Sequence, residues 1–262
     1  MIVTTRPAGA RPDEGRERDH GRMAERGSSP HPTADCPWLG WRRLDEDVHF
    51  GQSRYTCGPC PREGPAPCHG GVMTIEVRPA SDFADVRALL GPKSAGANVC
   101  WCLSHRIPSK LNNELRGPAR GEYVARLCGA QTPPGVIAYD GDEPVGWAAV
   151  APRSDTSYAR SRTIPHVDDL PVWSLWCIRV RPGHRKQGIS HALIAGAVAF
   201  ARTHGAPAVE AYPLDNGDAK VDMTMAYAGI RKNFERAGFT HAADTTSVLA
   251  GHPRVLMRLD LR

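Results

Sequence analysis

Residues 178–190 read Ile-Arg-Val-Arg-Pro-Gly-His-Arg-Lys-Gln-Gly-Ile-Ser, and this stretch decides how the chain folds. The apolar run over 172–181 predicts a central strand that leads into it, and residues 190–204 have the periodicity of a helix with a broad apolar face. A tight turn therefore joins a buried strand to a helix N-terminus. Backbone N–H groups in such a turn, assisted by the helix dipole, form a binding site for an anion.

The residue types in the turn agree with this interpretation. Gly188 lets the backbone approach a phosphate group without a Cβ in the way, and Ser190 can cap the helix and offer a hydroxyl group. His184, Arg185 and Lys186 add positive charge suited to further phosphates. The turn has neither the dinucleotide-binding glycine pattern nor the GK[ST] of a P-loop, so an ordinary strand–helix connection with surface charge remains the alternative.

Strand and helix signals alternate on both sides of this stretch. The element order β-α-α-β-β-β-α-β-α-β-β predicts an α/β fold with a mixed sheet flanked by helices. The expected strands are 74–78, 135–139, 144–150, 172–181, 208–212, 245–249 and 254–259. The expected helices are 81–90, 109–127 with a break near Gly117-Pro118, 190–204 and 223–237.

Residues 1–72 differ in composition from the rest of the chain. They hold 9 of the 23 prolines and 10 of the 26 glycines but few large apolar residues. Such a segment buries too little apolar surface to offset its ordering entropy, so we expect a disordered extension. Its 10 Arg balance its 10 Asp and Glu, which leaves the whole net charge of +5 in one domain over 73–262.

The composition also disfavours several classes of protein. The longest apolar stretch, 192–201, is much shorter than the roughly 20 residues of a membrane-spanning helix, and no secretory signal is recognisable. A cytoplasmic protein with reduced thiols is therefore expected. The positive charge is spread without an aromatic-interleaved stripe, so we expect no nucleic-acid binding.

The extension carries one pattern that favours a different function. Cys57-Gly-Pro-Cys60 is followed by Cys68-His69, and a C-x-x-C pair is a usual half of a zinc site. There is no second matched pair and no hydrophobic residue to pack around a metal. We therefore expect incidental thiols in a coil and no bound metal, and a zinc-binding interaction protein is an alternative.

The turn resembles motif A of the GCN5-related N-acetyltransferases (GNAT), whose pattern is V-x-P-x-x-R-x-x-G-x-G/A. Here Val180, Pro182, Arg185 and Gly188 match it, with Ser190 at the last position. The later Phe234-Glu-Arg-Ala-Gly238-Phe239 resembles the closing signature of the family. The element order over 73–262 is similar to the family fold along its whole length, which implies a mostly antiparallel mixed sheet.

The resemblance implies acetyl-CoA as co-substrate and direct acetyl transfer to an amine, with no covalent enzyme intermediate. The pyrophosphate would bind the amides of Arg185, Lys186, Gln187, Gly188, Ile189 and Ser190. The pantetheine arm would pair like an extra strand with Cys177, Ile178, Arg179 and Val180. The acetyl group would then lie near a gap between that strand and the strand at 208–212.

Direct transfer makes two demands on nearby groups. A lysine-like amine is almost wholly protonated at pH 7, so a base or water chain is useful. Glu210 is the first candidate base, with Asp215, Asp168 and Asp169 as others that the spacing does not separate. The tetrahedral oxyanion also needs a donor, for which we expect the backbone N–H of Ile178 or of a neighbour.

The sequence departs from the family at the residue that protonates the leaving thiolate. The family often has tyrosine there, and this chain has Phe234. Tyr227 lies seven residues earlier, one or two turns up the expected helix, and is the candidate substitute. A thiol of pKa about 8.5 can leave as the thiolate without being protonated, so activity does not require an acid.

Cys100-Trp101-Cys102 lies in the region that covers the acceptor in this fold. Two cysteines are too few for a metal site, although Cys177 could come near them. Buried packing thiols are the simpler interpretation. Trp101, Cys102 and Trp147 are nevertheless candidate substrate-wall residues, with Arg153 and Tyr158 on the same side.

These observations predict an acyl-CoA-dependent N-acetyltransferase. We expect it to act as a monomer or homodimer on an amine of a small molecule or protein, without a nucleic-acid or membrane partner. A non-catalytic acyl-CoA-binding sensor of the same fold is the main alternative.

Overall fold

The computed structural model describes residues 42–43, 53–56, 74–92, 94, 101–222 and 225–262. The chain divides into two units, Met1–Pro37 and Trp38–Arg262, and all described residues belong to the second. The predicted zinc pattern and most of the predicted disordered extension lie outside the described residues. Within 1–72, where the sequence predicts a mostly disordered extension, the described residues form two short strands, β1 Arg42–Arg43 and β2 Ser53–Thr56.

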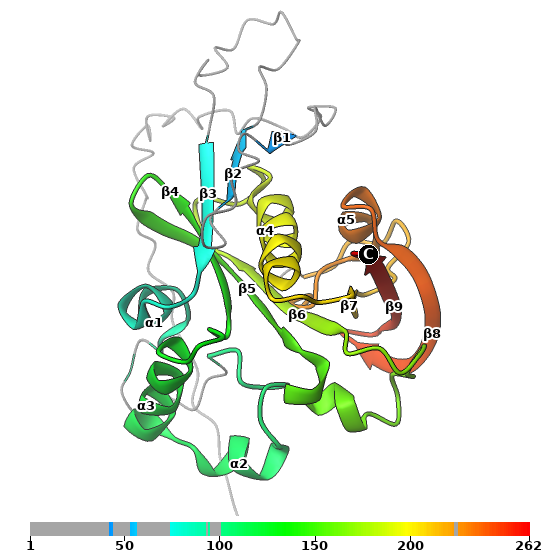
Figure 1. Ribbon diagram of the computed structural model, residues 1–262, viewed down its shortest axis with the longest axis horizontal. Helices are drawn as coiled ribbons and strands as arrows, with labels where there is room; N and C mark the ends of the chain where they lie inside the picture. The colour runs from blue at the N-terminus through cyan, green and yellow to red at the C-terminus, as the bar shows by residue number, and fades with distance from the viewer. Residues whose placement is uncertain (1–41, 44–52, 57–73, 93, 95–100, 223–224) are drawn as a thin grey trace, which may run out of the picture. The chain divides into compact units, whose positions relative to one another are not determined.

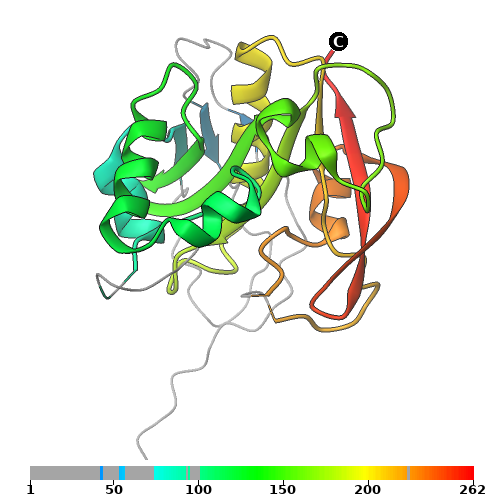
Figure 2. The same ribbon diagram turned by 90° about the horizontal axis from the view of Figure 1, so that it is seen from below.

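One sheet of nine strands organises the described residues in the order β1-β2-β3-β4-β5-β6-β7-β9-β8. Figure 2 shows β8 and β9, in orange and red, at the opposite end from β2. β6 and β7 pair in parallel and all other neighbours pair antiparallel, which confirms the predicted mixed, mostly antiparallel sheet. The remaining strands are β3 Thr74–Pro79, β4 Gly135–Asp140, β5 Glu143–Pro152, β6 Trp173–Val180, β7 Ala208–Ala211, β8 Thr240–Leu249 and β9 His252–Asp260.

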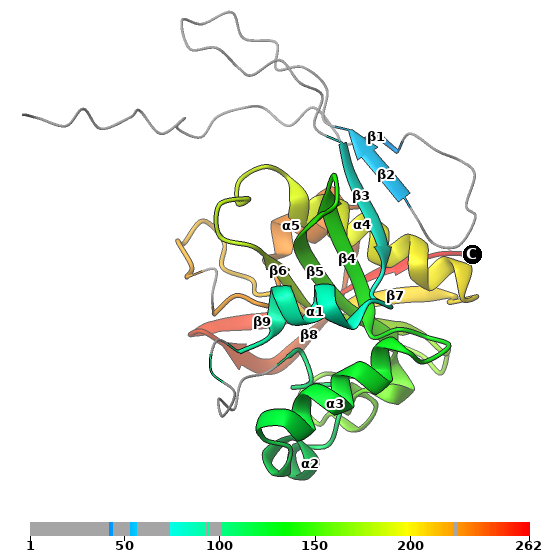
Figure 3. The same ribbon diagram turned by 90° about the vertical axis from the view of Figure 1, so that its left-hand side faces the viewer.

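The helices lie in separate groups, as Figures 1 and 3 show: α4 lies along the sheet, apart from α1, α2 and α3. The five α-helices of the described residues are α1 Phe83–Leu90, α2 Ser109–Glu114, α3 Gly117–Cys128, α4 Ile189–Thr203 and α5 Arg231–Arg236. Two short 3-10 turns, η1 Arg153–Asp155 and η2 Ser157–Arg160, follow β5. The predicted break in helix 109–127 is confirmed, with Pro118 in the first turn of α3.

The predicted helix over 223–237 is wrong for most of its length, because within 225–237, the part of this range that the structure describes, only α5 over 231–236 is helical. Gly229 adopts a φ of +83°, which a helix cannot contain. Its N–H donates to the carbonyl oxygen of Ala226, and its own carbonyl oxygen accepts from the N–H of Leu214, so residues 226–229 form a turn that is held to Leu214, just after β7. Tyr227 therefore belongs to a turn before α5.

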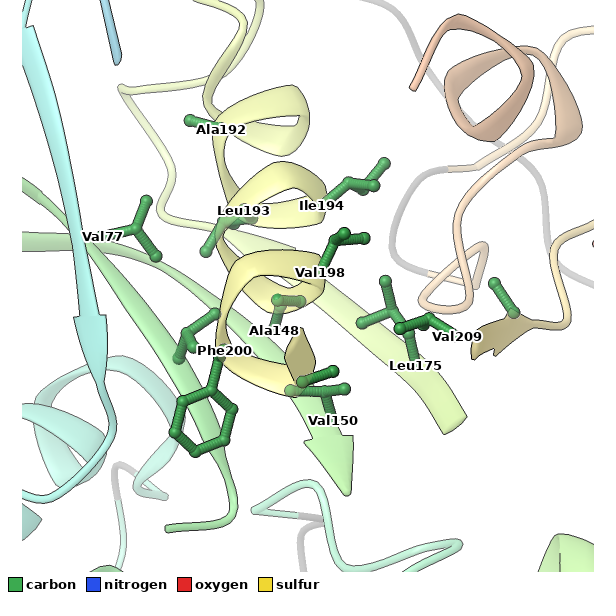
Figure 4. Close-up of a cluster of buried hydrophobic side chains, with 14 of the residues drawn as sticks. Val77, Ala148, Val150, Leu175, Ala192, Leu193, Ile194, Val198, Phe200 and Val209 are labelled. Atoms are coloured by element: carbon green, nitrogen blue, oxygen red, sulfur yellow. The ribbon is translucent and has the colours of Figure 1, made fainter. Parts of the chain in front are cut away.

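The core between α4 and the sheet holds the molecule together. Leu193, Ile194 and Phe200 of α4 are buried against sheet residues such as Val77 and Val150, as Figure 4 shows. Burying each such side chain stabilises the fold by about 1.5–3 kcal/mol. A second cluster on the opposite face joins α1, α3 and the 101–107 loop to β4, β5 and β6. The two clusters fix β6 from both sides and so position the residues around its end.

Candidate functional site

The turn between β6 and α4 is exposed and contains three residues with left-handed backbone. Gly183, Lys186 and Gly188 have φ values of +96°, +63° and +76°. Gly188 is the N-cap of α4, and no side chain caps this helix. Ser190 is the second residue of α4, so its predicted capping role is wrong. The carbonyl oxygen of Gly188 accepts from the N–H groups of His191 and Ala192, so the N–H groups of Ile189 and Ser190 are the ones without an acceptor within the helix.

Positive charge surrounds this helix N-terminus. Arg181 forms a 2.7 Å ion pair with Glu143, and His184 lies 3.9 Å from the same carboxylate. Arg185 and Lys186 are exposed, and within the described part of the chain neither has a carboxylate within 4.0 Å. Their charge is therefore available to an anion bound at the turn.

β6 and β7 pair over only three positions. The pairs run from Trp173 opposite Val209 to Leu175 opposite Ala211, and β6 then continues to Val180 without β7. A β-bulge lies at this point, because Leu175 and Cys177 face consecutive residues of β5. Bulges bend a strand and increase its twist. The predicted gap between β6 and the strand at 208–212 thus corresponds to a divergence that begins after Leu175.

The bulge also determines which side chains share a face. Trp176 is the extra residue, and both Trp176 and Cys177 pack in the cluster opposite α4. Ile178 packs partly against the α4 side. Two consecutive side chains of β6 therefore face the 101–107 loop at the place where β7 leaves.

The backbone of Ile178 already has a partner. Its N–H donates to the carbonyl oxygen of Tyr227 across 2.7 Å. The amide expected to stabilise an oxyanion is thus engaged by the 226–230 segment. The N–H of Arg181 donates to Val145 of β5, so along the strand the N–H of Val180 faces the same way as that of Ile178.

The candidate substrate-wall residues come together on the face opposite α4. The Sγ atoms of Cys102 and Cys177 lie 2.6 Å apart, so Cys177 does come near Cys102, a possibility that the sequence left open. Trp101 stacks on Phe83 with ring centroids 5.9 Å apart. Trp147 on β5 is buried and lies opposite Arg179 of β6. Its indole N–H has no partner among the described residues.

An aromatic cluster that the sequence did not predict lies beside this wall. The ring centroid of Tyr158 lies 4.6 Å from that of His105 and 4.1 Å from that of Tyr212. Arg254 is 4% exposed, and it donates to the carbonyl oxygen of Tyr212 and to the hydroxyl of Tyr158. These residues come from a loop, η2, the end of β7 and β9, so no spacing in the sequence connects them.

Burial shifts the pKa values of two residues in this cluster. The pKa of His105 is lowered to about 4, first by burial and second by the charge of Arg254. Burial also raises the pKa of Tyr158 to about 12. His105 is therefore neutral and Tyr158 protonated near pH 7.

Glu210 is buried in the middle of an ion-pair network. Its carboxylate lies 2.6 Å from Arg153 and 3.4 Å from Arg258, and the Tyr212 hydroxyl donates to it across 3.4 Å. Burial raises its pKa, while the two arginines oppose that shift. The structure thus brings the candidate Arg153 to this carboxylate and connects both to the aromatic cluster through Tyr212.

The other candidate bases differ in their surroundings. Asp168 pairs with Arg258 across 2.8 Å and so joins the ion-pair network of Glu210, whereas Asp215 pairs with Arg231 across 2.8 Å. Asp169 is exposed. Phe234 is fully buried, with its ring 5.3 Å from that of Phe239, on the α4 side of the sheet.

Two kinds of feature are absent from the described residues. No group of three or more His, Cys, Asp or Glu side chains in this part of the chain could hold a metal ion. Among the same residues, none of the helices combines the length and the apolar character that crossing a membrane requires.

Comparison with known proteins gives a match to a family model in the central part of the chain. Residues 105–223, which include β6, the turn and α4, match the model of the acetyltransferase (GNAT) family. No curated protein gives a match.

Similar solved structures include Ard1 from Thermoplasma volcanium, with 12% identity over 72% of this chain and 98% of that chain and a TM-score of 0.40. An acetyltransferase from Bacillus subtilis in complex with CoA has 17% identity over 48% of this chain and 76% of that chain, with a TM-score of 0.32. The NatC complex bound to Gag peptide and CoA has 12% identity over 72% of this chain and 99% of that chain, with a TM-score of 0.41.

Proposed function

We propose that the chain, which carries a GNAT-family acetyltransferase domain over residues 105–223, transfers an acetyl group from acetyl-CoA directly to a primary amine. The observation that carries this proposal is the divergence of β6 from β7 immediately before an exposed, positively charged turn at the N-terminus of α4. We further propose a cytoplasmic enzyme that acts as a monomer or homodimer on a small-molecule or protein amine.

The residues of the turn fit the pyrophosphate of acetyl-CoA. The first turn of α4 has no side-chain cap, and its N–H groups would take the phosphate oxygens as acceptors. Arg185 and Lys186 would add charge without first breaking an ion pair among the described residues. The proposed cofactor-binding residues are Cys177, Ile178, Arg179, Val180, Arg185, Lys186, Gln187, Gly188, Ile189 and Ser190.

Because the N–H of Ile178 is already hydrogen-bonded, the expected position of the thioester can be given more closely. Val180 presents its N–H on the side that β7 has left, and we assign it to an amide carbonyl of the pantetheine arm. The other N–H of β6 on this side, that of Ile178, already donates to the carbonyl oxygen of Tyr227. The thioester would therefore lie near Tyr227 and Cys177, where the aromatic cluster and the candidate wall meet.

The transfer itself forms a C–N bond to the amine and breaks the C–S bond of the thioester. The amine must lose a proton, and the leaving thiolate gains one or departs as the anion. Tyr227 is the proposed acid, because its backbone is fixed on β6 beside the expected thioester. Glu210 is the proposed base, since a carboxylate with a raised pKa accepts a proton more readily.

A non-catalytic acyl-CoA sensor is the second candidate, and one observation favours it. Phe234 occupies the position of the family tyrosine and is fully buried, so no acid is present there. In this case acetyl-CoA would bind at the same turn and no amine would be acetylated.

Release of free CoA thiol in the presence of an amine panel separates the two functions. The panel should contain amino acids, polyamines, aminoglycosides and peptides with free amines, and the full chain should be used. Amine-dependent thiol release that Gly188→Glu abolishes would support the transferase. Binding of acetyl-CoA without release for any amine would favour the sensor, and no binding would contradict both.

A further inference from the structure

The thiols of Cys102 and Cys177 are the closest pair of sulfur atoms among the described residues. Their Sγ atoms are 2.6 Å apart, about half an ångström more than a disulfide bond of about 2.05 Å. The two residues are 5% and 6% exposed and lie 75 positions apart in the chain. The fold, and not a local sequence motif, therefore brings these two sulfurs together.

Both cysteines are held in this arrangement by unusual backbone. Trp101 and Cys102 have φ values of +40° and +56°, in the left-handed region that non-glycine residues rarely adopt. Trp101 is anchored by its stack on Phe83 of α1. On the other side, the bulge at Trp176 directs Cys177 to the same face. Strained backbone of this kind persists only where surrounding contacts fix it, and it is concentrated at functional sites.

We propose that Cys102 and Cys177 form a modification site, in which a peroxide joins them by a disulfide bond that controls the acceptor side of the site. Each thiol gives up its proton, one S–S bond forms, and the two electrons reduce the peroxide O–O bond to an alcohol and water, or to two waters for hydrogen peroxide. A dithiol reductant reverses the step by thiol–disulfide exchange.

The position of the bond gives it a functional consequence, and this part rests on the proposed acetyl transfer. Cys177 precedes Ile178 in the strand assigned to the pantetheine arm, and Cys102 lies in the loop assigned to the acceptor wall. A covalent bond would tie the loop to that strand beside the expected thioester. We therefore expect the oxidised protein to lose at least tenfold in acetyl transfer and to recover with dithiothreitol.

Peptide mapping tests the bond without reference to activity. The full chain is treated with hydrogen peroxide, remaining thiols are blocked with N-ethylmaleimide, and the protein is digested with trypsin. Cys102 lies in tryptic peptide 94–106 and Cys177 in peptide 163–179. The expected product is a species two hydrogens lighter than the sum of these two peptides, with one N-ethylmaleimide added on Cys100. Because peptide 94–106 also contains Cys100, the cross-link should survive Cys100→Ser and disappear in Cys102→Ser.

The ratio of activity before and after oxidation tests the consequence, with amine acetylation followed by mass spectrometry. Wild type and Cys128→Ser should both lose activity on oxidation and recover it on reduction. In Cys102→Ser the activity before and after oxidation should be nearly equal, even if this variant is less active than wild type. Full alkylation of both cysteines after peroxide treatment would overturn the modification site. A cross-link with an unchanged ratio would overturn its control of activity. If the reduced protein acetylates no amine, the proposed function fails while the peptide map still decides the thiol site.

Discussion

The backbone N–H of Ile178 donates to the carbonyl oxygen of Tyr227 across 2.7 Å, so the turn before α5 lies directly on β6, the strand that leads to the turn before α4. This contact places a phenol-bearing residue at the divergence of β6 and β7 through its backbone. Substitution of the side chain therefore leaves the contact itself in place.

Tyr227→Phe removes the hydroxyl group and keeps the backbone contact. If Tyr227 protonates the leaving thiolate, we expect kcat to fall about tenfold, a modest loss because a thiol of pKa about 8.5 leaves tolerably unaided. KM for acetyl-CoA should not change. Steady-state kinetics with Tyr123→Phe on α3 as the matched control measures this, and unchanged turnover in Tyr227→Phe would remove Tyr227 from the mechanism.

Gly188→Glu adds a side chain and a negative charge where the phosphates are expected. Gly188 has a φ of +76°, so the substitution also strains the turn. We expect acetyl-CoA affinity, measured by calorimetry, to fall at least a hundredfold. The control is Gly141→Ala in the β4–β5 hairpin, where φ is +59° and an added Cβ meets nothing within 4 Å. Equal affinity in the two variants would place the cofactor elsewhere.

Glu210→Ala should destabilise the fold by about 3–5 kcal/mol, because removing one partner leaves buried charge on Arg153 uncompensated. Urea unfolding of the variant measures the loss. The control is Glu143→Ala, whose exposed pair with Arg181 is worth less than about 1 kcal/mol. If both variants lose the same small amount, the buried network does not contribute in this way.

The lowered pKa of His105 predicts that the folded protein loses stability in mild acid. Its folded pKa of about 4 is below the usual value of 6.5, so between these values the unfolded chain binds more protons than the folded one. Its contribution is complete above pH 6.5 and decreases by up to about 3 kcal/mol as the pH falls to 4. Urea unfolding between pH 4 and 7 should show a shallower slope in His105→Phe, which keeps an aromatic ring beside Tyr158. Parallel slopes would exclude the effect.

Gly196→Ala tests the packing of α4. An added Cβ would overlap the Val77 side chain on β3, and overpacking of this kind costs about 1–3 kcal/mol. Gly129→Ala is the control, because its added Cβ would lie 3.8 Å from the nearest atom, the Ala125 carbonyl oxygen. Thermal unfolding should show a lower Tm only for Gly196→Ala.

The sequence predicted the parts of the fold that depend on local patterns. The strand–turn–helix around Gly188 and the β4–β5 hairpin follow from apolar runs and turn residues, and both are found. The helix predicted over 223–237 failed because its apolar spacing looks helical, while the positive φ of Gly229 and its hydrogen bond with Leu214 favour a turn. Tertiary hydrogen bonds thus outweighed helical periodicity.

The candidate site was predictable only where it is contiguous in the chain. The turn residues form one segment, whereas Arg254, Tyr212 and His105 meet through three separate elements that pattern reasoning cannot connect. Glu210 was recognisable as a carboxylate in an apolar strand, but its two arginines were not. Cys177 was expected near Cys102 only as one option, since no spacing rule relates residues 75 positions apart.

The bulge at Trp176 shows that the candidate site depends on the number of residues in β6. β6 carries one residue more than β5 needs opposite it, and the surplus bends the strand away from β7. Deleting Trp176 would restore ordinary alternation and let the two strands stay side by side beyond Leu175. The place proposed for the pantetheine arm in the middle of the sheet would then be filled by the protein's own hydrogen bonds.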